Sequence, residues 1–298
     1  MERRRLGTTD LFAAPLGLGA GAIGSADLTE EQAGTLLNRA VDLGMNLVDA
    51  APSYGLAEER IGRHLSWRRG DVILSTKGGY GVPGVPDWTG ECIRRGVDRA
   101  LHLFRTDVLD LFHLHSCPLE TLRREDVLRA CRDVAQGGKV RVVAYSGEGE
   151  ALDYAVASGL FGAVQTSVNV CDQRGLDRGV KAAAARRMAV LAKRPLANAP
   201  WSARPPNGDD AAASEYRKRF LAMGLDRQEP PAGLDWAAVF LRFAAHAPGV
   251  TACLLGTRQI PHLSACLAAV EAGPLGENEV KLLGSAFRRV DAGWEGQI

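Results

Sequence analysis

Proton transfer could be carried out by four side chains in the amino-terminal half of the chain: Asp49, Tyr54, Lys77 and His115. A free tyrosine hydroxyl has a pKa of about 10 and is a poor proton donor at neutral pH. A lysine ammonium beside a phenol stabilises the phenolate, and an aspartate paired with that lysine keeps it charged and in place. A neutral histidine nearby could orient a carbonyl group or share in a proton relay. We therefore interpret Tyr54 as an acid catalyst and the other three as the residues that tune it.

Each of these residues also has an ordinary structural role when it is considered alone. Asp49 could cap a helix or turn, Lys77 could be a surface charge, and Tyr54 could be a half-buried aromatic side chain. The functional interpretation rests on position, because polar side chains stand at or just after the carboxyl ends of the predicted strands: Asp49, Lys77, His115, Ser146, Gln165, Lys193, Arg194, and Thr257 and Arg258 after Gly256. In an α/β barrel, this end of the strands carries the active site.

Short β-like runs alternate with helical patterns along the chain. The predicted strands cover residues 16–19, 46–49, 72–77, 108–115, 140–145, 164–167, 189–193 and 250–255. The predicted helices cover residues 29–43, 57–65, 91–104, 122–135, 150–158, 175–186, 236–245 and 261–272. The first of these helices starts with a capping box from Thr29 to Gln32 and ends at Gly44. This alternation predicts an α/β fold, a (β/α)8 TIM barrel, as a single domain over residues 1–298.

Three further segments lie outside the alternation. Residues 5–6 and 11–12 predict an amino-terminal β-hairpin. Residues 197–231 follow the seventh strand and predict a long loop with an extra helix at 211–223, and a loop of this length is usually functional or mobile. Residues 277–290 predict a final helix that covers one end of the barrel.

Three motifs at the predicted strand ends occur in order along the chain: DAAPSYG at residues 49–55, LSTK at 74–77 and DLFHLH at 110–115. They resemble the tyrosine, lysine and histidine motifs of the aldo-keto reductase family, and the resemblance extends over nearly the whole chain. It implies that an aldehyde or ketone is reduced by hydride from a nicotinamide cofactor. In that scheme Tyr54 protonates the carbonyl oxygen, Lys77 and Asp49 tune Tyr54, and His115 orients the substrate.

The same resemblance implies a nicotinamide site on the loops after the fifth to seventh strands. Ser146 and Gln165 match family positions that hold the nicotinamide. The family commonly has Asn where this chain has Gly147, so this position has no side chain that could bond to the carboxamide. Arg194 falls at or near the family's cofactor-stacking position, and a guanidinium can stack on an aromatic ring.

Glycine-containing segments at residues 19–24 and 256–258 are the candidates for contact with the rest of the cofactor. GAGAIG at 19–24 fits the GxGxxG dinucleotide fingerprint, but a Rossmann helix would begin within the glycines, whereas the capping box places it at residue 29. We expect instead that Gly21 lets the first barrel loop approach the cofactor. The segment Gly256–Thr257–Arg258 resembles the family's phosphate-binding segment, and Arg258 could pair with a ribose 2′-phosphate. The expected cofactor is therefore NADPH (NADP+).

The composition of the chain limits the classes of molecule that we expect it to bind. The 36 basic and 35 acidic side chains give a net charge of +1, which argues against nucleic-acid binding. No apolar run approaches the roughly 20 residues of a membrane helix, and the amino terminus lacks the apolar core of a secretory signal. The six cysteines form no CxxC pair and are expected to be buried thiols. We expect a cytoplasmic protein that acts on a small-molecule carbonyl substrate, with aromatic side chains from residues 80–88, Trp201 and Trp294 in its pocket.

Two other functions remain open. A nucleotide-sensing or partner-binding protein on the same fold would bind the cofactor without turnover. A metal-dependent barrel hydrolase could use His113 and His115, which share the barrel interior. No third ligand stands out at the other strand ends, so we expect no metal and interpret His113 as a core histidine.

Overall fold

The computed structural model describes residues 2–202 and 211–297. The barrel strands are β3 (Leu16–Gly19), β4 (Leu47–Asp49), β5 (Ile73–Gly78), β6 (Leu109–His115), β7 (Val140–Ser146), β8 (Ala163–Ser167), β9 (Ala189–Lys193) and β10 (Ala252–Leu255). They form a closed parallel barrel in the order β10-β3-β4-β5-β6-β7-β8-β9. Every predicted strand is present within two residues of its expected bounds. The TIM-barrel prediction is confirmed.

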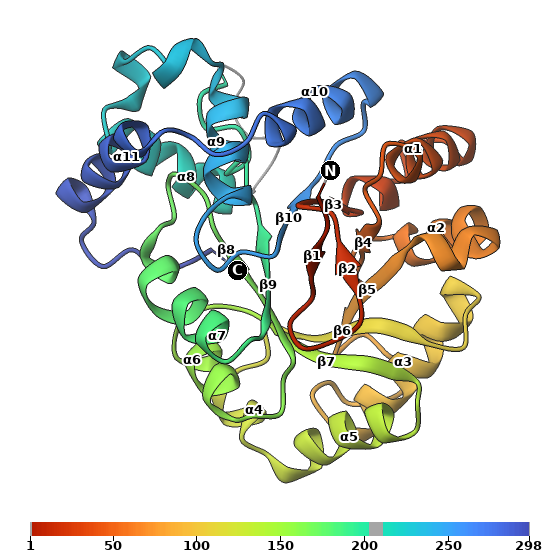
Figure 1. The fold of residues 1–298 in the computed structure, drawn as a ribbon. Helices are drawn as coiled ribbons and strands as arrows, with labels where there is room; N and C mark the ends of the chain where they lie inside the picture. Colours follow the sequence, from red (N-terminus) through yellow and green to blue (C-terminus); the bar gives the residue numbers. More distant parts are fainter. Residues whose placement is uncertain (1, 203–210, 298) are drawn as a thin grey trace.

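Helices surround the barrel (Figure 1). They are α1 (Glu30–Asp42), α2 (Ala57–Leu65), α3 (Gly90–Phe104), α4 (Leu119–Leu122), α5 (Glu125–Gln136), α6 (Gly149–Ala157), α7 (Lys181–Ala185), α9 (Trp236–Ala245) and α10 (Ile260–Glu271). Shorter turns are η1 (Ala22–Gly24), η2 (Ser66–Asp71), η3 (Leu176–Val180), η4 (Leu225–Arg227) and η5 (Pro231–Gly233). The predicted helix at 122–135 begins only at residue 125, because the backbone of Arg124 is extended and separates α4 from α5. The predicted helix at 175–186 begins with the π-helical turn η3.

The capping box at the start of α1 forms as predicted. Thr29 Oγ1 accepts a hydrogen bond from the Gln32 backbone N–H at 3.2 Å, and Gln32 Oε1 accepts one from the Thr29 backbone N–H at 3.0 Å. Two N–H groups that the helix leaves unpaired are thereby satisfied. These bonds fix where the loop after β3 ends.

A short antiparallel hairpin lies across the amino-terminal end of the barrel (Figure 1). Its strands are β1 (Arg4–Arg5) and β2 (Phe12–Ala13). The register is the expected one, with Arg5 opposite Phe12, but the ladder lies one residue farther from the turn than predicted. Leu6 is 1% exposed and its side chain packs with the inward-facing residues at the base of the barrel, while its backbone N–H still donates to the Leu11 carbonyl oxygen at 2.8 Å.

The segment after β9 and the carboxyl-terminal helix form a second apolar cluster beside the barrel. The extra helix is α8 (Ala211–Ala222), and the final helix is α11 (Glu277–Val290). The cluster joins α8, α9 and α11 through Tyr216, Phe220, Phe240 and Phe287. The final helix therefore packs beside α8 and α9, and the residues beyond it, 291–297, reach the barrel mouth. The Pro- and Gly-containing part of the predicted loop, residues 203–210, lies outside the described residues.

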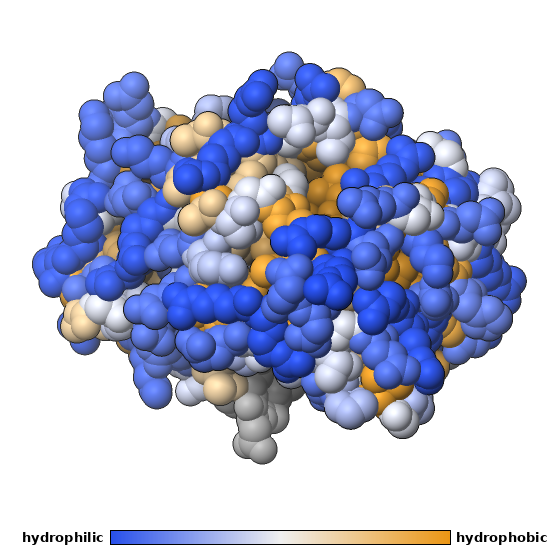
Figure 2. All heavy atoms as spheres, turned by 90° about the horizontal axis from the view of Figure 1, so that it is seen from below, coloured by the Kyte–Doolittle hydropathy of each residue, from blue (hydrophilic) through white to orange (hydrophobic). Residues whose placement is uncertain are grey.

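One face of the molecule can be followed in the space-filling view. On the face shown in Figure 2, hydrophilic residues dominate and apolar residues show mostly in the middle of that face. The six cysteines are free thiols, and all are buried. Within the described part of the chain, no helix has both the length and the apolar character that a bilayer-crossing helix requires.

Candidate active site

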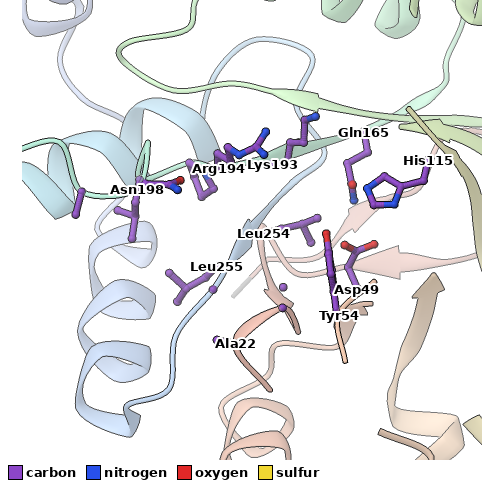
Figure 3. A pocket seen from close by; sticks show the side chains of 16 residues that line it. Ala22, Asp49, Tyr54, His115, Gln165, Lys193, Arg194, Asn198, Leu254 and Leu255 are labelled. Atoms are coloured by element: carbon purple, nitrogen blue, oxygen red, sulfur yellow. The ribbon is translucent and has the colours of Figure 1, made fainter. Parts of the chain in front are cut away.

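The expected acid catalyst and its neighbours meet at the carboxyl-terminal mouth of the barrel. Asp49, Tyr54 and His115 line a cavity of about 650 Å³, shown in Figure 3. Its other walls include Gly19, Gly21, Ala22, Gln165, Lys193, Arg194, Asn198, Leu254, Leu255 and Gly256. This volume is typical of small-molecule sites, which span roughly 300–1,000 Å³. Trp201 and Trp294 lie elsewhere, because they pack on Phe240 and Phe287 in the second apolar cluster.

Lys77 and Asp49 form a buried ion pair beneath this cavity. Lys77 Nζ lies 2.5 Å from Asp49 Oδ2 and donates a second hydrogen bond to the Ala50 carbonyl oxygen at 2.8 Å. The two side chains are 1% and 3% exposed. Burial alone would lower the pKa of Lys77, but the Asp49 carboxylate and the Tyr54 hydroxyl outweigh it and raise this pKa above its ordinary value. A charged ammonium therefore stands 4.8 Å from the centre of the Tyr54 ring.

His115 stands at the cavity wall as a neutral imidazole. Its ring meets the Tyr54 ring edge-on, with the ring centres 6.3 Å apart. Burial and the nearby Lys77 charge lower the pKa of His115 to about 3. At neutral pH the ring can therefore make a directional hydrogen bond with a substrate without adding a charge to the site.

A second layer of hydrogen bonds beneath Asp49 was not predicted. Ser75 Oγ donates to Asp49 Oδ1 at 2.7 Å and lies 3.1 Å from His113 Nε2. Burial lowers the pKa of His113 to about 4, so its ring is neutral. Because the Ser75 hydroxyl hydrogen is donated to Asp49, its oxygen is left to accept a hydrogen bond from Nε2–H of His113. His113 is the buried core histidine that we expected, although its Nδ1 has no partner among the described residues. Strand alternation could have revealed this layer, because Ser75 and His113 share a face with Lys77 and His115.

The loop that carries Tyr54 packs tightly against the first barrel loop. A Cβ on Gly24 would lie 1.5 Å from the Tyr54 carbonyl oxygen, and Gly55 has a φ of +55°. The Leu56 backbone N–H donates to the Gly24 carbonyl at 3.1 Å. Gly21 lines the cavity itself, where a Cβ would meet only the Tyr54 ring at 4.0 Å. Within the GAGAIG segment, Gly24 thus allows the loop that carries Tyr54 to pack closely, and Gly21 leaves space at the cavity wall.

Ser146 and Gln165 meet the requirements of a nicotinamide carboxamide. Ser146 Oγ donates to Gln165 Oε1 at 3.0 Å. This bond leaves Gln165 Nε2 buried and, among the described residues, without a hydrogen-bond partner. A buried donor left unpaired costs about 1–3 kcal/mol, and the carbonyl oxygen of a carboxamide would satisfy it. Because Gln165 lines the cavity next to Tyr54 and His115, these residues fit the nicotinamide end of the expected cofactor.

Gly147, where the family commonly has Asn, is closed to any side chain. A Cβ at this position would lie 2.4 Å from the hydroxyl oxygen of Tyr145. That hydroxyl donates to the Cys117 carbonyl at 3.1 Å, and Tyr145 is 2% exposed, so it cannot easily move. The departure from the family pattern is therefore coupled to the buried tyrosine beside it.

We expect Gly147→Ala to lower the free energy of unfolding by about 1–3 kcal/mol through overpacking. Gly70→Ala is the matched control, because a Cβ there meets nothing within 4 Å, and its effect should stay within about 0.5 kcal/mol. Urea denaturation of the two variants measures both values. Equal stability of the two variants would show that Tyr145 can move aside.

Arg194 follows β9 in a segment with unusual backbone. Left-handed backbone occurs at Arg194, Ala197, Asn198 and Ala199, with φ between 47° and 57°. Such conformations are costly for residues other than glycine and cluster at functional sites. Arg194 Nη1 donates to the Gln297 carbonyl oxygen at 2.5 Å, and Ser167 Oγ donates to the same oxygen at 3.0 Å. The carboxyl-terminal residues therefore contact Arg194 at the cavity wall.

The candidate phosphate segment occupies the turn between β10 and α10. Gly256 lines the cavity, whereas Thr257 and Arg258 are not among the lining residues, and Arg258 is exposed. Thr257 Oγ1 accepts a hydrogen bond from the Gln259 backbone N–H at 3.1 Å and so orders the first turn of α10. Helix amino termini favour anions, which is consistent with a phosphate at this turn. That this turn binds the cofactor phosphate stays a prediction.

The part of the chain that the structure describes contains no cluster of metal-ligating side chains. No group of three or more His, Cys, Asp or Glu side chains there could hold a metal ion. The two histidines of the HLH motif instead have separate partners. His113 bonds to Ser75, and His115 bonds to Tyr80.

Comparisons with known proteins agree with this geometry. The model of the Aldo/keto reductase family matches residues 15–287. An uncharacterized oxidoreductase, YqkF of Bacillus subtilis (strain 168), is 26% identical over 302 residues, covering 96% of each chain. L-Galactose dehydrogenase of Arabidopsis thaliana is 31% identical over 156 residues, 49% of each chain.

A solved structure gives the same result. Aldo-keto reductase AKR11C1 from Bacillus halodurans, in its holo form, superposes with a TM-score of 0.83 at 25% identity, covering 96% of each chain. The family match favours the reductase over the metal-dependent hydrolase. The chain belongs to the aldo/keto reductase family and is an oxidoreductase that uses a nicotinamide cofactor.

Proposed function

We propose that this protein reduces an aldehyde or ketone to an alcohol with NADPH, and that Tyr54 is the general acid. One observation carries the proposal: a buried Asp49–Lys77 ion pair holds an ammonium beside the Tyr54 ring, in the wall of a cavity that also presents Gln165. When bound, the nicotinamide would supply the hydride that forms the new C–H bond at the carbonyl carbon.

The side chains of this protein would transfer a proton to the carbonyl oxygen. As the C=O bond becomes a C–O bond, the Tyr54 hydroxyl gives its proton to the oxygen. Lys77 stabilises the resulting phenolate, and Asp49 keeps Lys77 charged. His115 orients the carbonyl oxygen toward Tyr54 through a hydrogen bond. Solvent then returns a proton to Tyr54, so one hydride and one proton are consumed for each alcohol formed.

The preference for NADPH over NADH is expected to depend on Arg258. Arg258→Ala should weaken NADPH binding by about 10- to 100-fold, because hydrogen bonds to charged groups contribute about 1.5–3 kcal/mol. NADH lacks the 2′-phosphate, so its dissociation constant should change by no more than about twofold. Titrations with both nucleotides measure the ratio, with the exposed Arg129→Ala on α5 as the control. An equal loss for both nucleotides would show that Arg258 does not read the 2′-phosphate.

The proposed reaction is tested by following NADPH consumption over a panel of aldehydes and ketones. The expected result is turnover of at least one carbonyl compound, with the matching alcohol as product. NADPH binding without turnover over the whole panel would favour the nucleotide-sensing alternative.

A further inference from the structure

The side chain of Tyr80 bridges the two loops that flank the candidate active site. Its hydroxyl oxygen lies 2.6 Å from His115 Nδ1 and 2.9 Å from Ser53 Oγ, and Ser53 directly precedes Tyr54. The Tyr80 and His115 ring centres are 5.6 Å apart. Tyr80 stands two residues after β5, whose carboxyl end carries Lys77. It therefore contacts His115 directly, although no family motif identified it.

The loop that carries Tyr80 is built to hold this position. Gly79 has a φ of +109°, and a Cβ there would lie 2.3 Å from the Trp88 ring. The Trp88 backbone N–H donates to the Gly79 carbonyl at 2.5 Å, and the Trp88 ring packs 6.0 Å from the Tyr80 ring. Trp88 itself has a φ of 60°. Two residues in left-handed conformations thus fix the turn that presents the Tyr80 hydroxyl to His115.

A neutral imidazole carries its proton on only one of its two nitrogens, and the partner of one nitrogen decides which. His115 is neutral at physiological pH because burial and Lys77 lower its pKa to about 3. Nδ1 faces Tyr80, whereas Nε2 has no hydrogen-bond partner among the described residues. The direction of the hydrogen bond between Tyr80 and His115 therefore determines what Nε2 offers to a substrate.

The Tyr80 hydroxyl hydrogen can point to Ser53 or to His115, and acid and base strength favour donation to His115. A phenol is a stronger acid than the serine hydroxyl, and an imidazole nitrogen is a stronger base than a hydroxyl oxygen. The shorter contact is also the one to His115, 2.6 Å against 2.9 Å to Ser53. Hydroxyl hydrogens rotate to suit their partners, and Ser53 is exposed and can donate to the Tyr80 oxygen in turn.

We propose that Tyr80 is a positioning residue that donates to His115 Nδ1 and so holds His115 in the tautomer protonated at Nε2. His115 then presents a hydrogen-bond donor to the carbonyl oxygen of the substrate. This inference rests on the proposed function for its effect on catalysis, but the tautomer is a property of the protein without cofactor or substrate.

The tautomer can be measured by long-range proton–nitrogen correlation NMR on protein labelled with ¹⁵N-histidine. The His115 signals are assigned by their loss in His115→Asn. We expect the wild type to show the Nε2–H tautomer. In Tyr80→Phe, which keeps the ring beside Trp88, the Nδ1–H tautomer should appear, because Ser53 or water can then accept from Nδ1.

Activity supplies the second readout. Tyr80→Phe should lower kcat/KM for the best carbonyl substrate by about tenfold, the effect of one hydrogen bond of about 1.4 kcal/mol. Ser53→Ala should lower it by less than about twofold, because Tyr80 can still donate to His115. Tyr154→Phe on α6, away from the cavity, is the control for loss of a phenolic hydroxyl and should leave kcat/KM unchanged.

Two results would overturn the proposal: a wild-type spectrum with Nδ1–H, or an unchanged Nε2–H tautomer in Tyr80→Phe. The wild-type spectrum alone decides the first, even if the variant does not fold. Failure of the proposed function would look different, because the carbonyl panel would then show no turnover, or Tyr54→Phe would turn over as fast as the wild type, whatever the tautomer of His115.

Discussion

Replacing Tyr54 with Phe is expected to lower kcat/KM for carbonyl reduction by about 10²- to 10⁴-fold, the usual contribution of a positioned general acid. The phenylalanine ring keeps the edge-on contact with His115 and the packing on Lys77, so the change removes only the hydroxyl group. NADPH affinity should stay within about twofold of the wild-type value, because binding does not need the hydroxyl proton. Steady-state kinetics and a fluorescence titration measure the two quantities on the same preparation.

The matched control for this variant is Tyr154→Phe, which removes a phenolic hydroxyl on α6 and should leave both quantities unchanged. If Tyr54→Phe retained more than a tenth of the wild-type kcat/KM, another group would have to protonate the substrate. The assignment of the general acid would then be wrong.

Replacing Lys77 with Met is expected to affect stability and activity together. Met fills a similar volume but leaves the Asp49 carboxylate buried, with Ser75 as its remaining side-chain donor. Breaking a buried ion pair in this way costs about 3–5 kcal/mol, so the free energy of unfolding should fall by that amount. The variant also lacks the ammonium beside Tyr54, and kcat/KM should fall by about 10²-fold or more.

A double variant separates the two effects. Adding Asp49→Asn to Lys77→Met removes the uncompensated charge while an amide oxygen can still accept from Ser75. We expect most of the lost stability to return and the activity to remain low, since the Tyr54 phenolate is still unsupported. Urea denaturation of the wild type, Lys77→Met, Asp49→Asn and the double variant completes the double-mutant cycle. A double variant no more stable than Lys77→Met would show that the cost comes from packing rather than from charge.

Most of the fold followed from local sequence patterns. Strand and helix periodicity placed every barrel strand, and the Thr29 capping box fixed the start of α1 because both of its hydrogen bonds are local. The structure differs from the predicted element bounds at the hairpin and at the start of α5. The hairpin ladder lies one residue farther from the turn, where the Leu6 side chain packs into the base of the barrel, and the extended backbone of Arg124 delays the start of α5.

The residues of the site that lie at strand ends could be predicted from the sequence, because the carboxyl ends of the barrel strands lie close together. Asp49, Lys77 and His115 end neighbouring strands, so the closing of the barrel brings them together without further information. Tyr80 could not be placed in this way, because its contact with His115 depends on the turn that Gly79 and Trp88 form.

Gly147 and the carboxyl-terminal residues were also beyond prediction from sequence. The space at Gly147 is taken by the ring of Tyr145, and the contact of Gln297 with Arg194 joins residues 103 apart. In both cases the packing of side chains in three dimensions decides the outcome, and no local pattern reports it.

Equilibrium titration of the purified protein would show whether the cavity at the barrel mouth binds NADPH. Tryptophan fluorescence can follow the binding of NADPH and, separately, of NADH, without knowledge of the carbonyl substrate. We predict saturable binding of one NADPH per chain, tighter than that of NADH and weakened by Arg258→Ala. If neither nucleotide binds, the cavity is not a nicotinamide site and the proposed function is wrong.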